Sequence, residues 1–132
     1  MKPVGGSITK TLDRGAELTC ADNSGAKQLE IISVDSTNSR RGRRATAGVG
    51  DKIRVKVLRG DQEVKGQVHQ AVVVRQAKEY RRPTGLRVEF EDNAAVLVEE
   101  NGLPKGNVTR GPIAKEVVER FSAIGKIASK VV

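Results

Sequence analysis

A run of aliphatic residues between positions 71 and 98 constrains the fold more than any other part of the chain. Residues 72–74 are consecutive valines, and a short β-branched run of this kind predicts a buried strand. A loop containing proline and glycine follows, and residues 86–90 and 94–98 then predict two returning strands. The stretch therefore predicts a sheet that presents a cationic loop.

Further strand signals before this stretch complete the predicted sheet. Residues 52–57 alternate strictly between charged and aliphatic side chains, so that one face should line a core. Other strands are predicted at residues 17–20, 29–34 and 68–75. Five or six short strands separated by turns predict a mainly β fold, a small closed antiparallel β-barrel, because closure removes the exposed edges of a sheet.

The C-terminal part of the chain predicts short α-helices packed on the barrel. Pro112 suits the first turn of a helix, and Ile113, Val117 and Phe121 follow at a spacing of four residues. Gly125 interrupts this pattern, and a second short helix is predicted after it, at residues 126–132. The chain is predicted to form a single domain over residues 1–132, with a flexible tail at 1–6, the barrel and its basic loops at 7–100, and the helices at 111–132.

The excess positive charge is concentrated in two segments. Residues 36–50 contain four arginines and no acid, and residues 75–87 contain five basic residues and only Glu79 as an acid. These segments together account for the whole net charge of +8, because the rest of the chain holds as many acids as bases. Charge concentrated in this way indicates a polyanionic partner such as nucleic acid.

Two interpretations remain open for some of these charges. Arg40, Arg41, Arg43 and Arg44 could form a solvated loop, although the absence of any acid beside them favours contact with phosphates. The charged face of residues 52–57 could equally keep the barrel exterior soluble or contact RNA. The alternation pattern does not decide between these two roles.

The sequence offers no recognisable catalytic or metal-binding pattern. His69 and Cys20 are the only residues of their types, so no metal site, disulfide or cofactor site is predicted, and no enzymatic activity. Gly48 and Gly50 form an isolated Gly-x-Gly that lacks the third glycine of a dinucleotide-binding turn. Tyr80 is the one candidate for stacking on a base, which disfavours a single-strand binding module. No segment is predicted to cross a membrane.

Several motifs, in order, resemble a known family. They are Ala-Asp-Asn-Ser-Gly-Ala-Lys at 21–27, Ala-Gly-Val-Gly-Asp at 47–51, the whole stretch 71–98, and Gly-Pro-Ile-Ala-Lys-Glu at 111–116. Together they resemble the universal large-subunit ribosomal protein L-fourteen family, in its archaeal form. The resemblance covers nearly everything from Leu18 to Val132.

This resemblance implies a five-stranded barrel with C-terminal helices, placed on the large ribosomal subunit where it meets the small subunit. It also implies binding to large-subunit rRNA, an intersubunit bridge with small-subunit rRNA, and ribosomal protein L-three as a neighbour. A subunit anti-association factor is a further implied partner. The implied location is the cytoplasm, in the ribosome. The alternative is a free cytoplasmic nucleic-acid-binding barrel.

The predicted RNA contacts come from two sources. The matching motifs imply contacts at the first turn and at the Arg-Arg-Pro segment, whereas charge alone suggests the remaining positions. The predicted RNA-binding residues are Asn23, Ser24, Lys27, Arg40, Arg41, Arg43, Arg44, Lys52, Arg54, Lys78, Arg81, Arg82 and Arg87.

Overall fold

The computed structural model describes residues 8–34 and 46–132. The predicted tail at residues 1–6 and the arginines Arg40, Arg41, Arg43 and Arg44 lie outside the described residues. The elements are β1 (Glu17–Cys20), β2 (Ala26–Val34), β3 (Lys52–Gly60), β4 (Val68–Arg75), β5 (Tyr80–Arg81), β6 (Arg87–Val88), β7 (Ala94–Val98), β8 (Pro112–Ile113), α1 (Lys115–Arg120), α2 (Ser122–Ile127) and β9 (Lys130–Val131).

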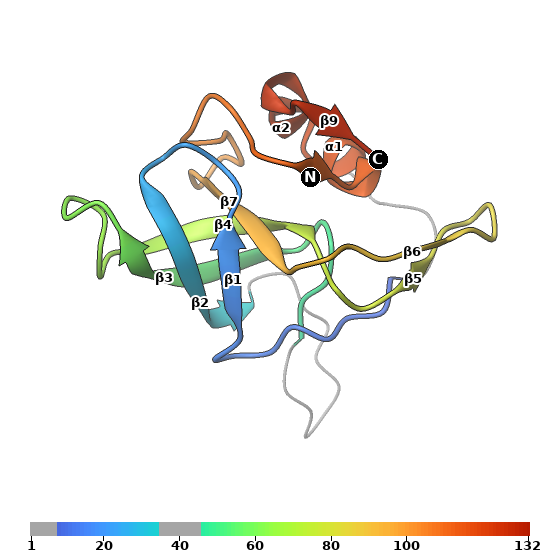
Figure 1. Cartoon of the computed structure of the whole chain (residues 1–132), viewed down its shortest axis with the longest axis horizontal. Coiled ribbons are helices and arrows are strands. Elements are labelled where there is room, and N and C mark those ends of the chain that lie inside the picture. Colours follow the sequence, from blue (N-terminus) through green and yellow to red (C-terminus); the bar gives the residue numbers. More distant parts are fainter. Residues whose placement is uncertain (1–7, 35–45) are drawn as a thin grey trace.

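Five strands close into a barrel, which confirms the expected five-stranded barrel, and their order round the ring is β1-β2-β3-β4-β7 (Figure 1). Four of the pairs are antiparallel, but β1 and β7 pair in parallel, with Thr19 beside Ala94 and Cys20 beside Ala95. The prediction of a purely antiparallel barrel therefore needs a small correction. An odd number of strands cannot alternate in direction all the way round a closed ring, so one pair must be parallel.

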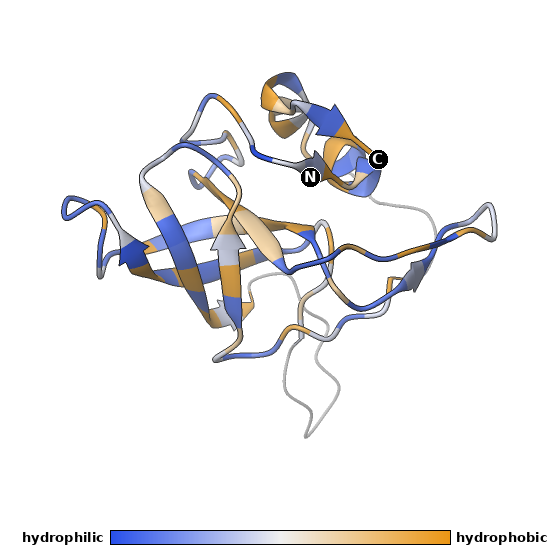
Figure 2. Cartoon of the chain, in the orientation of Figure 1, coloured by the Kyte–Doolittle hydropathy of each residue, from blue (hydrophilic) through white to orange (hydrophobic). Residues whose placement is uncertain are grey.

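The barrel interior is built by the alternation seen in the sequence. In β3 the side chains of Ile53, Val55 and Val57 are at most 1% exposed, whereas Arg54 and Lys56 face solvent. Figure 2 shows the same alternation of hydrophobic and hydrophilic bands along β2 and β3. Strands with one apolar face are expected where the other face meets water.

Strand β7 and the second part of β4, from Ala71 to Arg75, are buried on both faces. Val73 belongs to the core inside the barrel, whereas Val72 and Val74 belong to a second core that also contains Val117 and Phe121 of the C-terminal segment. This second core explains the unbroken valine run, because a strand covered on both sides has no polar face. Each fully buried valine stabilises the fold by about 1.5–3 kcal/mol relative to an exposed one.

The C-terminal helices are confirmed, but their boundaries differ from the prediction. Pro112 begins the strand β8 rather than a helix, and β8 pairs in parallel with β9, where the sequence predicted a second helix. Proline suits a strand edge as well as a first helical turn, so the residue alone could not decide. Gly125 lies inside α2 and does not interrupt it. A Cβ there would lie 2.7 Å from Val118 Cγ1, so glycine allows α1 and α2 to pack closely.

Candidate nucleic-acid interface

The cationic segment at residues 78–88 forms a hairpin that extends away from the barrel (Figure 1). Strands β5 and β6 pair antiparallel, and the Arg82 amide donates to the Leu86 carbonyl at 2.8 Å. Gly85 has a φ of +91°, and its amide donates to the Arg82 carbonyl. Proline followed by a left-handed glycine suits a three-residue hairpin loop. The predicted strand at residues 86–90 is therefore shorter, and the predicted loop contains β5.

The two faces of this hairpin carry different side chains. Tyr80 lies opposite Val88, and Arg81 lies opposite Arg87. Because side chains alternate across a strand, the two arginines share one face and both are exposed. Like charges directly opposite each other destabilise a hairpin. Glu79 offsets part of this repulsion, because its Oε1 lies 3.1 Å from Arg87 Nη1.

The other face is fixed to α1 by a buried carboxylate. Glu116 is only 3% exposed, and its two oxygens accept hydrogen bonds from the Tyr80 hydroxyl and from Arg82 Nε, each at 2.8 Å. Arg82 also donates to the Val132 carbonyl at 2.6 Å. Burial, followed by the bond to Glu116, raises the pKa of Tyr80. Tyr80, the one candidate for stacking on a base, is buried at 1% exposure, so its ring is not available for stacking.

A second arginine of the predicted cationic stretch is also used inside the protein. Arg75 is 7% exposed, and its guanidinium makes a two-pronged ion pair with Asp92, at 2.9 and 3.2 Å. The same group donates to the carbonyls of Arg110 and Pro112 at 2.8 and 3.0 Å. Arg75 therefore fastens β4 to the segment leading into α1. The charge count could not separate this structural arginine from surface ones.

The turn after β1 holds the predicted residues Asn23 and Ser24. Asn23 Oδ1 accepts from the amides of Asn107 and Val108, at 2.9 and 3.3 Å, which ties this turn to the loop before β8. The Ser24 amide and hydroxyl donate to Asp22, whose carboxylate is 1% exposed. Burial and the neighbouring Asp22 raise the pKa of Cys20 to about 12. Sequence inspection missed Asp22 as the organising residue, although its Asp-Asn-Ser-Gly context is a turn signal.

The remaining predicted residues in the described part of the chain lie on the outer surface of the barrel and on the hairpin. Lys27 and Arg54 are exposed on β2 and β3, whereas Lys52 donates to the Glu100 carbonyl at 2.8 Å. Lys78 is exposed at the base of the hairpin. Figure 1 shows the turn between β1 and β2 well separated from the hairpin. The predicted residues therefore form at least two separate cationic regions.

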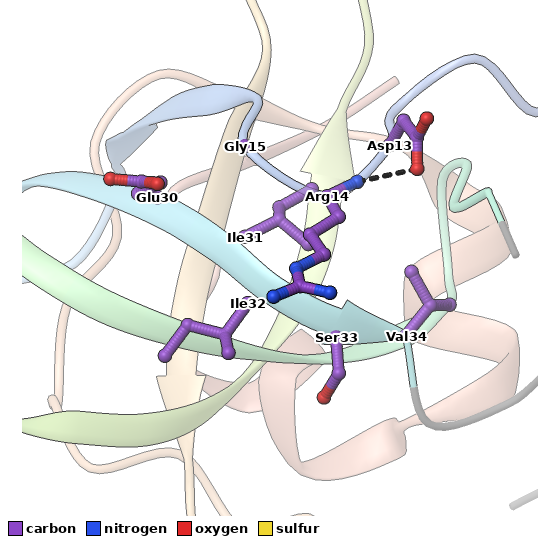
Figure 3. Close-up of a pocket in the computed structure, with 8 residues that line it drawn as sticks. All are labelled: Asp13, Arg14, Gly15, Glu30, Ile31, Ile32, Ser33 and Val34. Carbon is purple, nitrogen blue, oxygen red and sulfur yellow. Dashed lines mark hydrogen bonds between the residues drawn. The ribbon is translucent and has the colours of Figure 1, made fainter. Parts of the chain in front are cut away.

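A hollow over the end of β2 is lined by Arg14, Glu30 and Val34 among others (Figure 3). Its lining mixes acids and a base, which does not suit a polyanion. Within residues 8–34 and 46–132, no group of His, Cys, Asp and Glu side chains is arranged to hold a metal ion. The helices in the described part of the chain are too short and polar to span a bilayer.

Residues 11–132 match the family described as ribosomal protein L14p/L23e. The large ribosomal subunit protein uL14 of Haloarcula marismortui is 48% identical over 132 residues, which is the full length of both chains. The protein of the same name from Natronomonas pharaonis is 47% identical over the same length. That of Methanothrix thermoacetophila is 48% identical over 122 residues, covering 92% of this chain and 90% of its own.

Proposed function

The chain belongs to the ribosomal protein L14p/L23e family, in its archaeal form, and we propose on that basis that it is a structural constituent of the large ribosomal subunit. The family predicted from the sequence motifs is thereby confirmed. The proposed role is non-enzymatic and is performed in the cytoplasm, within the ribosome. In more detail, the protein binds large-subunit rRNA and contributes to the bridge with small-subunit rRNA.

The cross-strand pair of Arg81 and Arg87 supports RNA binding most directly. These side chains lie opposite each other on the exposed face of a short hairpin, where their repulsion destabilises the free protein. A phosphate placed between them converts that repulsion into two charge-assisted contacts. Lys78 adds a third exposed cation at the base of the same hairpin.

Exposed cations at separate places on the surface support contact with more than one segment of RNA. The hairpin presents Arg81 and Arg87, and the barrel presents Lys27 and Arg54 on other strands. A bridge between subunits requires a protein to present separate surfaces in this way. Ribosomal protein L-three and a subunit anti-association factor are proposed partners that rest on the family resemblance. The predicted contacts at Asn23, Ser24, Lys52 and Arg82 stay predictions, as do those of the arginines between residues 40 and 44.

Sedimentation tests the ribosomal role against a free nucleic-acid-binding barrel. We expect the protein in a native lysate to move with large subunits on a sucrose gradient at moderate salt. It should shift to the top fractions only when salt is high enough to strip ribosomal proteins from rRNA. Protein found in the top fractions at moderate salt would support the free barrel instead.

Salt-dependent binding tests contact through phosphates. Arg81→Gln and Arg87→Gln should each make the slope of log affinity against log salt concentration shallower by about one unit. Each variant contacts one phosphate fewer, so its binding releases one condensed counterion fewer. Binding is measured against an rRNA fragment and a shape-matched variant with swapped base pairs. Lys65→Gln is the matched control, since Lys65 is exposed in the turn between β3 and β4, at the opposite end of the molecule (Figure 1).

Both arginine variants should weaken binding to the two RNAs to a similar degree, because phosphates carry no sequence information. The Lys65 control should change the slope less than either hairpin variant. Weakening on only one of the RNAs, with an unchanged salt slope, would show that bases are read directly and would overturn the phosphate assignment.

A further inference from the structure

The cationic hairpin is attached to the rest of the protein at its base, where Tyr80 belongs to the second core and Val88 packs against it. Its strands contain two residues each, and Leu86 near its tip is 67% exposed. Among the described residues, the polar side-chain contacts that leave residues 80–88 for other elements go to Glu116 and to the Val132 carbonyl. The direction in which the hairpin points is therefore decided at its base.

Glu116 sits on a rigid support. It belongs to α1, where the neighbouring Val117 is fully buried in the second core against β4. The Ala114 amide just before α1 donates to the Val74 carbonyl of β4 at 3.2 Å. The Glu116 carboxylate is thus fixed relative to the barrel, and so are Tyr80 and Arg82, which donate hydrogen bonds to it.

The strand alternation connects this anchor with the exposed cations. Tyr80 and Arg82 are two residues apart and both reach Glu116, whereas Arg81 between them points the other way with Arg87. The Arg82 guanidinium also lies 5.9 Å from the Tyr80 ring centroid. Fixing Tyr80 and Arg82 therefore fixes the face on which Arg81 and Arg87 stand.

From this geometry we infer that Glu116 is a positioning residue, whose buried carboxylate holds the hairpin so that Arg81 and Arg87 meet RNA phosphates in a set orientation. The inference rests on the proposed RNA-binding function. Glu116 itself contacts no RNA in this arrangement, because it is only 3% exposed and its two oxygens accept from Tyr80 and Arg82. Its effect on binding is transmitted by the two hairpin residues that it holds.

Because Glu116 is negatively charged, the inference can be tested by whether its replacement raises or lowers the affinity for RNA. Removing a negative charge from a protein that binds a polyanion should strengthen binding if only net charge matters. Loss of the anchor should weaken binding, because the cations are no longer held in one orientation. Glu119→Gln on the same helix is the matched control, since Glu119 is exposed and its replacement removes the same charge.

The experiment measures the affinity of full-length protein for protein-free large-subunit rRNA at one fixed salt concentration. We expect Glu116→Gln to weaken binding about fivefold, the equivalent of about one ordinary hydrogen bond. Glu119→Gln should leave affinity unchanged or slightly higher. Tyr80→Phe, which removes one of the two bonds to Glu116 and no charge, should weaken binding in the same direction. It also serves as the test variant if Glu116→Gln does not fold.

A double-mutant cycle separates positioning from general destabilisation. Arg81→Gln should weaken binding about fivefold in the wild type but about twofold or less in the Glu116→Gln protein. In that protein Arg81 is no longer held in position, so it already contributes less to the affinity for RNA. Additive effects of the two substitutions would overturn the positioning role, as would tighter binding by Glu116→Gln. If neither Arg81→Gln nor Arg87→Gln weakens binding at all, the RNA-binding proposal for the hairpin itself fails.

Discussion

Asp22→Ala should lower the free energy of unfolding by about 3–5 kcal/mol, because it removes the acceptor shared by several buried donors. The carboxylate accepts from the Leu97 amide at 3.0 Å, from the Ser24 amide at 3.1 Å and from Cys20 Sγ at 3.0 Å. Without it the Leu97 N–H, in the buried strand β7, has no partner. The substitution would therefore weaken the structure at the place where β1, β7 and the turn after β1 meet.

Urea unfolding followed by far-ultraviolet circular dichroism measures this change. Glu63→Ala is the control, because Glu63 is exposed in the turn between β3 and β4 and should change stability by less than about 0.5 kcal/mol. Asp22→Asn retains one acceptor oxygen and should fall between the two. A loss below about 1 kcal/mol for Asp22→Ala would show that water replaces the carboxylate and that the turn is not organised by it.

Phe121→Ala should cost about 3–5 kcal/mol of stability, the usual range for deleting a buried aromatic ring. The ring is 9% exposed, joins the second core between α1 and α2, and lies close to Gly102, where a Cβ would stand 3.3 Å from Phe121 Cδ1. The same unfolding experiment applies. Leu86→Ala should be nearly neutral, because Leu86 is largely exposed. A cost under about 1 kcal/mol at Phe121 would mean that the helices contribute little to the fold.

The barrel strands were predictable because their signal is local. The alternation in β3 and the valine run in β4 each follow from the burial of one face or of both, and neighbouring residues alone reveal them. The boundaries of the C-terminal elements were not predictable, because Pro112 and residues 130–131 become strands only by pairing with each other. Such pairing depends on the tertiary fold, which sequence periodicity does not encode.

The candidate interface was predictable only as a charged segment. Counting charges treats Arg75, Arg81, Arg82 and Arg87 as equivalent, although Arg75 and Arg82 are held by carboxylates from distant parts of the chain. Strand alternation alone could have placed Arg82 on the opposite face from Arg81. The partner Glu116, which lies 34 residues further along the chain, could not have been found without the fold.

The ring of strands closes between β1 and β7, so the order of synthesis matters for folding. Strands β2, β3 and β4 can pair as soon as each is made, because each lies beside its predecessor. The free edge of β1 has to wait for a strand that ends at Val98, and contacts between such distant segments form slowly. Until then the nascent chain is an open sheet whose unpaired edges can join another chain. A delay in translation while the hairpin is being synthesised would prolong that vulnerable state.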